Sequence, residues 1–241
     1  MRKDDLEVFS KMVKLGNENK VERPKMPKGK LNDEYTTSKT SPLQRKIKRL
    51  NLGCGKFKKE GYINVDYNKD VDPDVIHDLN VFPYPFNDDE FDLIEADHVL
   101  EHLDDPFRVM KEIHRIAKHG ASVIIRVPHF SRGFTHPEHK RGFDVTFPFY
   151  FQPSFQGGYQ GVEFKLEKMK LSWFAQPYLK KTVLPYPIFL IATVIGKIID
   201  FFANLSPFLC SRLWCYLVGG FEEIEFHFKV KKQKPGEKTE I

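Results

Sequence analysis

The sequence is poor in cysteine, and its first residues lack the pattern of a secretion signal. Its three cysteines, Cys54, Cys210 and Cys215, form neither an even-numbered disulfide framework nor a Cys-x-x-Cys pair, and this indicates a reducing compartment. The first residues, Met-Arg-Lys-Asp-Asp, are charged and lack the apolar core of a signal peptide. We therefore expect a cytoplasmic protein.

A long unbroken apolar run is also missing. The most apolar stretch, residues 188–205, is interrupted by Lys197 and Asp200, and its uninterrupted part is about half of the ~20 residues that a bilayer span requires. The sequence therefore predicts no transmembrane helix. We expect residues 188–218 either to pack in the core or to form an apolar cover that could rest on a membrane or accept a lipid-linked substrate.

Neither sign of charge dominates the chain. The formal net charge is +5 over 241 residues, and the basic residues are scattered, with concentrations in the first 48 residues and after Lys229. A nucleic-acid-binding protein usually presents a contiguous basic face, which this sequence does not show. We expect no nucleic-acid partner, although the mild positive charge permits contact with an acidic surface.

The composition predicts one compact domain behind a polar leader. Residues 1–42 are rich in Lys, Glu, Asn, Pro and Thr and have little to bury, which is typical of a mobile segment. The hydrophobic content of 41% is enough for one core in residues 43–241. Within that domain, residues 129–220 are predicted as a loop and an apolar helical cover. Residues 221–232 alternate apolar and polar side chains and predict a final strand.

Short apolar runs alternate with helical patterns after residue 47. Strands are predicted at 48–52, 62–65, 75–77, 91–96 and 121–127, a helix at 106–118 that Gly120 ends, and a strand pair or one long strand at 162–173. This alternation implies an α/β fold with a mostly parallel, doubly wound sheet. Ligands of such sheets bind beyond the carboxyl ends of the strands.

A glycine turn follows the first predicted strand. Gly53-Cys54-Gly55 comes directly after Leu52, and the next strand ends on Asp66. Glycine lets the backbone turn sharply and approach a ligand closely, and an acid at the end of the next strand can accept hydrogen bonds from ribose hydroxyls. Gly-x-Gly also occurs in ordinary tight turns, so the motif alone does not decide between the two roles.

Six segments in their order along the chain resemble the class I S-adenosylmethionine-dependent methyltransferases, especially the small methyltransferase domain. They are Leu-Asn-Leu-Gly-Cys-Gly (50–55), Gly-Tyr-Ile-Asn-Val-Asp (61–66), His-Asp-Leu-Asn (77–80), Asp-Asp-Glu-Phe-Asp-Leu-Ile (88–94), His-Val-Leu-Glu-His-Leu (98–103) and Ala-Lys-His-Gly (117–120). The resemblance covers about a third of the chain. It implies an enzyme with a Rossmann-like, seven-stranded sheet, with residues 43–241 as the methyltransferase domain and S-adenosylmethionine as cofactor.

The resemblance also implies roles for residues around the cofactor. The turn would lie under its methionine part, an acid would hold the ribose, an acid and a leucine would meet the adenine, and a further acid would face the methionyl group. These residues are, in that order, Gly53, Cys54 and Gly55; Asp66; Asp78 and Leu79; and Asp97. Carboxylates suit the sulfonium and ammonium cations that the cofactor carries.

The motif departs from the family pattern at two points. Phe57 stands where a third glycine is usual, and only about ten residues separate Gly55 from Asp66, whereas a dinucleotide-binding unit has ~20. The first crossover helix must therefore be very short or replaced by a loop. This spacing argues against an NAD-binding unit.

Histidines near the predicted cleft are candidate bases. Methyl transfer needs an aligned nucleophile and, for a hydroxyl, removal of its proton. His98 and His102 follow the fourth strand, and His129 follows the fifth. In the resembling family, residues 128–144 would be the substrate-recognition loop, and here they are rich in His, Arg and Phe. For any one of these histidines a structural hydrogen bond is the competing interpretation.

A metal site is an alternative interpretation of the same region. His98-Val-Leu-Glu101-His102 matches the His-x-x-Glu-His pattern of inverted zinc peptidases, but it spans a strand-to-helix junction rather than one long helix. Some methyltransferases bind a divalent ion with a Glu-x-x-Glu-His version of this stretch. Further candidate ligands are His129, His136 and His139. The simpler reading, in which Glu101 and His102 orient the helix start, leads us to predict no metal.

The sequence does not identify the acceptor of the methyl group. The chain has 22 Phe, many of them after residue 130, which favours an apolar or lipid-linked small molecule. An RNA methyltransferase would need a basic face that the sequence lacks. The alternative from another class is a non-catalytic cofactor-binding or membrane-associated scaffold, against which the presence of both Asp66 and Asp78 argues.

Overall fold

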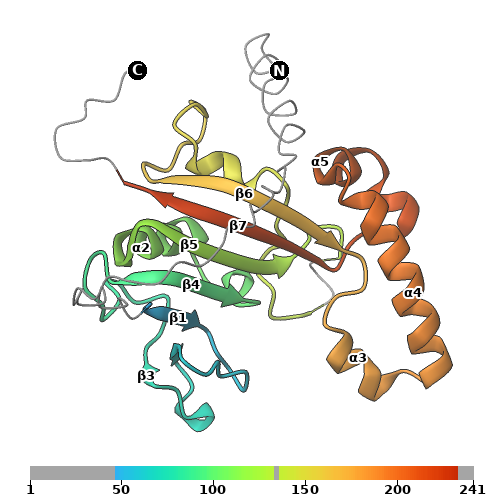
Figure 1. Ribbon diagram of the computed structural model, residues 1–241, viewed down its shortest axis with the longest axis horizontal. Helices are drawn as coiled ribbons and strands as arrows, with labels where there is room; N and C mark the ends of the chain where they lie inside the picture. Colours follow the sequence, from blue (N-terminus) through green and yellow to red (C-terminus); the bar gives the residue numbers. More distant parts are fainter. Residues whose placement is uncertain (1–46, 133–135, 233–241) are drawn as a thin grey trace, which may run out of the picture. The chain divides into compact units, whose positions relative to one another are not determined.

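The computed structural model describes residues 47–132 and 136–232, which belong to one compact unit, residues 45–241. The predicted leader, residues 1–42, lies outside the described residues. Seven strands form one sheet in the order β3-β2-β1-β4-β5-β7-β6 (Figure 1). They are β1 (Arg49–Leu52), β2 (Ile63–Asp66), β3 (Val75–Ile76), β4 (Phe91–Asp97), β5 (Ala117–Pro128), β6 (Glu163–Ser172) and β7 (Glu223–Lys231).

The pairing confirms the predicted seven-stranded, mostly parallel sheet. Neighbours among β1 to β5 are parallel, whereas β7 runs antiparallel to both β5 and β6. Strand β6 therefore points the same way as β1 to β5, and its carboxyl end lies at the same edge of the sheet as theirs. The segment predicted as a strand pair or one long strand is a single strand of ten residues.

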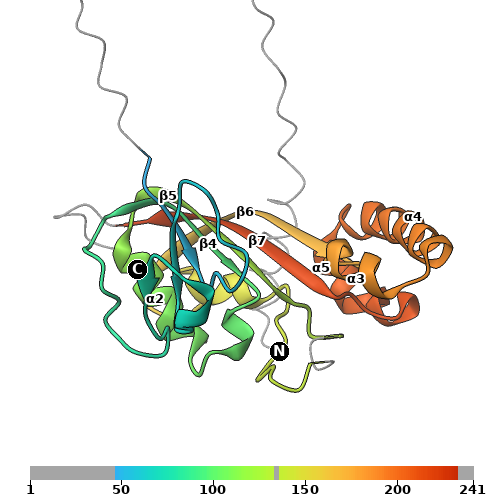
Figure 2. The same ribbon diagram turned by 90° about the horizontal axis from the view of Figure 1, so that it is seen from below.

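Helix α2 (Pro106–Ile116) covers one face of the sheet together with η4 (Phe147–Phe151), a short 3₁₀ helix (Figure 2). The Asp105 side chain caps α2 by accepting a hydrogen bond from the Arg108 N–H at 3.0 Å. Phe107 of α2 contacts Phe147 and Phe151 of η4. The two elements thus share one aromatic core on this face of the sheet.

The end of α2 differs from the prediction. We expected the helix to continue to Lys118 and to end at Gly120, but it ends at Ile116 and β5 begins at Ala117. Ala117 is buried and pairs with Phe91 of β4, so strand pairing ends the helix before the glycine is reached.

The opposite face of the sheet is polar. Glu95 of β4, Arg126 of β5 and Glu225 of β7 point to it, each half-buried. Residues 53–62 between β1 and β2 contain no helix, which confirms the predicted short first crossover. Lys59 and Tyr62 of this crossover lie on the polar face, where both donate hydrogen bonds to the Glu95 carboxylate.

A group of helices follows β6 and precedes β7, beside the carboxyl edge of the sheet (Figures 1 and 2). We call residues 177–218 the helical lobe. Its elements are α3 (Pro177–Val183), α4 (Tyr186–Ala203), α5 (Pro207–Leu209), the π-helix η5 (Cys210–Trp214) and the 3₁₀ helix η6 (Cys215–Val218). Helices therefore form in the segment for which the sequence predicts a helical cover.

The lobe turns an apolar surface to solvent. Within α4 only Gly196 and Ala203 are buried, so residues 188–205 do not pack in the core as a whole. Among the described residues, α4 is also the one helix whose length and composition would allow it to cross a membrane, and 11% of it is buried. The sequence predicts no transmembrane helix here, because Lys197 and Asp200 interrupt the apolar run and leave its unbroken part short.

Candidate functional site

The glycine turn at the end of β1 has an open side. Gly53 has a φ of +63°, and a Cβ built on it would lie 2.4 Å from the Val99 Cγ2, so the position admits only glycine. Gly55 has a φ of +48° and no heavy atom within 4 Å of its would-be Cβ. Cys54 between them is buried, and its N–H donates to the Val65 carbonyl at 2.9 Å. The turn is thus fixed to β2 while the backbone at Gly55 faces open space.

Asp66 lies beside this turn at the end of β2. Its two carboxylate oxygens accept hydrogen bonds from the Gly55 N–H at 2.8 Å and from the Asn68 N–H at 2.9 Å. These contacts fix the orientation of the carboxylate, and each oxygen keeps a second lone pair. The geometry suits an acceptor for two ribose hydroxyls.

The predicted adenine contacts fall into two kinds. Asp78 is exposed, and its Oδ1 accepts from the Asn80 N–H at 2.9 Å. Leu79 is 5% exposed and belongs to the hydrophobic core, and its carbonyl accepts from the Tyr84 hydroxyl at 3.0 Å. Asp78 is therefore available to a ligand, whereas the Leu79 side chain offers little surface to an adenine ring.

Asp97 at the end of β4 is held by two cations. Its Oδ2 lies 2.7 Å from the Lys59 Nζ and its Oδ1 lies 2.6 Å from the Arg126 Nη1. Burial raises the pKa of Asp97, but these two partners outweigh burial and hold the pKa below its usual value. A methionyl ammonium group would have to share this carboxylate with Lys59 and Arg126.

His98 directly follows β4 and adopts a left-handed φ of +52°. Its Nε2 lies 2.8 Å from a Glu223 oxygen and its Nδ1 lies 3.3 Å from the Glu101 Oε1. Burial lowers the pKa of His98, but the two carboxylates raise it to about 9. The imidazole then already carries its proton at neutral pH, and this argues against the predicted role of His98 as a base.

His129 at the end of β5 is fully buried. Ser211 donates to the Asp144 Oδ1 at 3.0 Å, so the His129 Nε2 must donate to the Ser211 Oγ at 2.9 Å. The Nδ1 is then free to accept from the Ser131 hydroxyl at 2.7 Å. Burial lowers the pKa of His129 to about 4. Both ring nitrogens are satisfied, so the geometry favours the structural interpretation of His129 over the predicted base.

His102 lies in η2 (Leu100–His102), the short helix that follows β4. The structure brings its ring together with Glu101 and with His139 from the loop after β5. Of the alternative metal set His98, Glu101 and His102, the structure keeps the last two, while His98 turns its Nε2 to Glu223. The role of His102 as a base remains a prediction.

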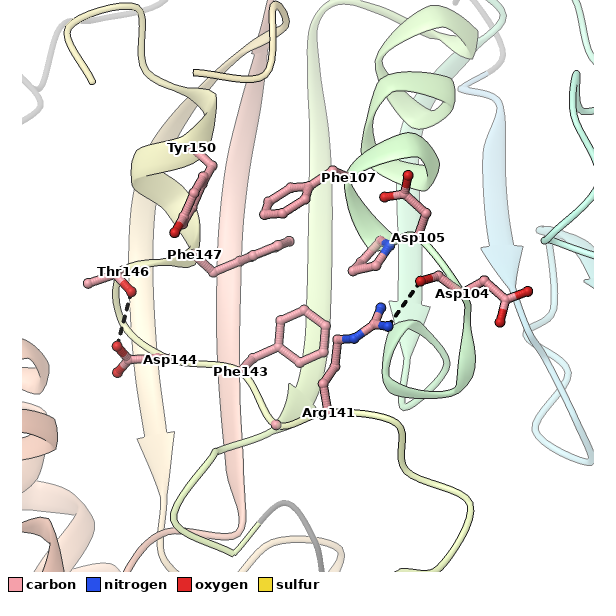
Figure 3. A pocket seen from close by; sticks show the side chains of 11 residues that line it. Asp104, Asp105, Phe107, Arg141, Phe143, Asp144, Thr146, Phe147 and Tyr150 are labelled. Carbon is pink, nitrogen blue, oxygen red and sulfur yellow. Dashed lines mark hydrogen bonds between the residues drawn. The ribbon is translucent and has the colours of Figure 1, made fainter. Parts of the chain in front are cut away.

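A pocket of about 380 Å³ lies between the start of α2 and residues 141–150 (Figure 3). Its walls are aromatic: Phe107, Phe143, Phe147 and Tyr150. At its rim Arg141 donates to the carbonyls of Leu103 and Asp104 at 3.0 and 2.9 Å. A concave site with aromatic walls and a few polar groups is suited to an organic ligand.

Residues 50–125 match the family model of a methyltransferase domain. The match spans the glycine turn, Asp66, Asp78 and the end of β4. Residues 50–125 of this chain therefore form a methyltransferase domain.

Solved structures of methyltransferases resemble this one at low identity. One from Archaeoglobus fulgidus, a SAM-dependent methyltransferase, has a TM-score of 0.47 and 17% identity, with 78% of this chain and 87% of that chain covered. One from Mesorhizobium loti has a TM-score of 0.46 and 12% identity, with 78% and 93% covered. The assignment of the methyltransferase domain rests on the sequence match alone. No curated protein matches the chain.

The residues at the carboxyl edge fit the cofactor of this methyltransferase, S-adenosylmethionine. Gly55 leaves room beside the turn, Asp66 offers carboxylate lone pairs, and Asp78 is exposed. When bound, the cofactor supplies a methyl group on a positively charged sulfur. The protein's own task is to bind, to orient and to exclude water.

The sequence analysis missed the cations beside Asp97 and the aromatic pocket. Arg126 interrupts the apolar run of β5, and that interruption could have drawn attention to it. Lys59 carries no such signal, because it reaches Asp97 from a loop 38 residues away. The density of aromatic residues in 143–151 was a usable signal for the pocket.

Proposed function

We propose that this methyltransferase acts on an apolar or lipid-linked small molecule while its helical lobe rests on the cytoplasmic surface of a membrane. The observation that carries this proposal is the outward face of α4. Eight large apolar side chains there are each between 43% and 64% exposed. They are Ile188, Leu190, Ile191, Val194, Ile195, Ile198, Phe201 and Phe202.

Neighbouring elements extend the same kind of surface. Val183 at the end of α3 is 80% exposed, and Leu213 and Leu217 of η5 and η6 are 75% and 85% exposed. Single exposed apolar residues are ordinary, but contiguous patches mark membrane or partner surfaces. The apolar character of the lobe therefore favours a hydrocarbon environment.

The charge of the lobe suits an anionic surface. Residues 177–218 contain four basic residues and one acidic residue, Asp200. Lys181 and Lys197 are exposed, and each basic residue near an anionic leaflet contributes about 1 kcal/mol to binding. Asp200 does not oppose this, because its Oδ1 accepts from the Trp173 N–H at 2.6 Å on the inner side of α4.

Contacts on the inner side of α4 favour docking of the helix on the membrane surface over crossing of the bilayer. Asn204, which ends the helix, exchanges two hydrogen bonds with the backbone of Leu171 in β6, each 2.8 Å long. Together with the bond from Trp173 to Asp200, these contacts would have to break before the helix could cross a bilayer. Docking by the outer face leaves them in place.

The aromatic pocket supports an acceptor with a ring or an apolar chain. Phe107, Phe147 and Tyr150 provide flat apolar walls. The pocket is built by the segment after β5 and the start of α2, which both follow the carboxyl edge where Gly55 and Asp66 lie. A small molecule that is partly embedded in lipid fits both the pocket and the exposed lobe.

Cofactor binding is tested by calorimetric titration with S-adenosylmethionine and with its demethylated product. We expect micromolar binding to the wild-type protein and at least a tenfold loss for Asp66→Ala, because the acceptor of the ribose hydroxyls is removed. A folded wild-type protein that binds neither compound would contradict the enzymatic function. The non-catalytic scaffold would then be the better interpretation.

Membrane docking is tested by flotation with lipid vesicles. We expect binding to vesicles that contain anionic lipid, weaker binding to zwitterionic vesicles, and loss of binding in Ile191→Glu/Ile198→Glu. Ile76→Glu is the matched control, because Ile76 is 63% exposed in β3, away from the lobe. Equal binding of the lobe variant and the control would refute docking by α4.

A further inference from the structure

A buried carboxylate without a hydrogen-bond partner lies in η2. Glu101 is 0% exposed, and neither of its two oxygens has a hydrogen-bond partner. Burying a carboxylate is costly unless it is paired or coordinates a metal. Native proteins leave few such groups unsatisfied, and an unmodelled ion is one of the usual reasons. Its one close charged neighbour is His98, whose Nδ1 lies 3.3 Å from the Glu101 Oε1, and this contact leaves both carboxylate oxygens without a hydrogen bond and open to a ligand.

Two imidazole rings lie against this carboxylate. A Glu101 oxygen and one nitrogen each of His102 and His139 all lie within 4.8 Å of one another. The ring centroids of His102 and His139 are 4.9 Å apart, and the His139 Nε2 lies 3.9 Å from the Glu101 Oε1. Ligand atoms bound to zinc at about 2.1 Å are roughly 3.4 Å apart in a tetrahedral site. Side-chain rotations that move these atoms by about an ångström would bring all three within bonding distance of one ion.

The tautomer of His102 suits a ligand. Its Nδ1 lies 3.2 Å from the Glu138 carbonyl oxygen, which can only accept, so the Nδ1 carries the hydrogen. The Nε2 of the neutral ring then presents a lone pair. A histidine that ligates a metal usually donates its other N–H to a carbonyl or carboxylate in this way.

The backbone holds the two segments together. The Lys140 N–H donates to the Glu101 carbonyl at 2.9 Å, and Arg141 donates to the Leu103 carbonyl at 3.0 Å. His139 is therefore placed beside η2 by a main-chain hydrogen bond of Lys140 and a side-chain hydrogen bond of Arg141. This is the preorganisation that a binding site requires.

We propose that Glu101, His102 and His139 bind a divalent transition-metal ion, with zinc as the first candidate. Two imidazoles and one carboxylate match the donor set of zinc and iron sites and are poorly suited to magnesium or calcium, which prefer oxygen ligands. Three protein ligands leave a position open for water or for an oxygen atom of a small molecule. The site does not depend on the membrane or on the acceptor.

The competing explanation is an ion pair with His98. The His98 Nδ1 is 3.3 Å from the Glu101 Oε1, and the imidazolium of His98 described above offsets the buried charge with no metal. The two explanations differ in the role of His139: a metal site needs it, whereas the ion pair does not.

The test is metal binding to the full chain without S-adenosylmethionine. Protein stripped with a chelator is titrated with Zn²⁺ by calorimetry and with Co²⁺ by visible absorption at pH 7.5. We expect one Zn²⁺ per chain and the absorption bands of cobalt in a low-coordinate nitrogen and oxygen site. His139→Gln and Glu101→Gln should each weaken binding at least tenfold.

His119→Gln is the matched control, because His119 is exposed and lies in β5, away from η2. It should bind as the wild type does. Circular dichroism checks that each variant is folded, and His139→Gln serves if Glu101→Gln does not fold. No binding to the wild type, or equal binding by His139→Gln and the wild type, would overturn the proposal. Neither result bears on cofactor binding, which is measured separately.

Discussion

At the scale of single residues, the two glycines of the turn after β1 have different reasons to be glycine. Both have left-handed φ angles, but only Gly53 would bring a Cβ against Val99, whereas Gly55 faces open space. One glycine therefore serves the packing of the turn against Val99, and the other leaves the space in which we propose that the cofactor binds.

This difference predicts different outcomes for two alanine variants. Backbone strain should cost each about 1–3 kcal/mol, but Gly53→Ala should lose more stability because of its contact with Val99. Gly55→Ala should remain folded and bind S-adenosylmethionine more weakly, since its methyl group fills the open side of the turn. Thermal unfolding and calorimetry measure the two effects, and equal melting temperatures would contradict the assignment.

His129 predicts a dependence of stability on pH. The unfolded residue takes up a proton below about pH 6.5, whereas in the folded protein burial delays this to about pH 4. The unfolded state therefore binds more protons between these values, and stability falls as the pH is lowered from 6.5 to 4. The loss from this one group is about 3 kcal/mol.

The measurement is denaturant unfolding at pH 7 and pH 5 for the wild type and for His129→Gln. The variant does not titrate at this position, so its stability should change less between the two pH values. An identical pH dependence in both proteins would show that His129 is not held neutral in the fold.

At the scale of elements, the joint between α4 and β6 depends on one side chain. β6 is the last strand of the sheet, and its Leu171 N–H and carbonyl point away from β7 and bond to Asn204 instead. A side-chain amide has both a donor and an acceptor, spaced to match the N–H and the carbonyl of one residue. Asn204 thus satisfies the edge of the sheet and attaches the lobe to it.

Replacing Asn204 by alanine should loosen this joint. Two backbone groups of Leu171 would lose their partners, at a cost of about 1–3 kcal/mol. We expect faster hydrogen exchange at the Leu171 amide and in α4, with little change in β1 and β4. Unchanged exchange at Leu171 would mean that the amide is protected by other contacts.

At the scale of the whole molecule, the sequence predicts what depends on local pattern. Apolar periodicity located the strands and α2, and the short spacing from Gly55 to Asp66 predicted the missing crossover helix. The sequence could not predict contacts between segments that lie far apart along the chain. The ion pair of Arg126 with Glu225 joins residues 99 positions apart, and His139 reaches Glu101 from the loop beyond β5.

The sequence also did not show which apolar residues of α4 are buried and which are exposed. Ile191 and Ile198 fit a core helix as well as an exposed one, because composition does not tell which face meets the sheet. In the same way, the position of His129 after a predicted strand did not show whether the histidine is a catalytic base or a buried structural residue. Its role depends on hydrogen bonds to Ser131 and Ser211.

The outward face of α4 also determines how purified protein should behave in plain buffer. Apolar side chains that meet water gain free energy by covering one another, at about 25 cal/mol per Å², so copies of the chain should associate through their lobes as concentration rises. We expect the hydrodynamic radius measured by light scattering to grow with concentration and to return to that of a monomer when a mild detergent is added. A radius that stays constant without detergent would mean that the face is covered by the chain itself.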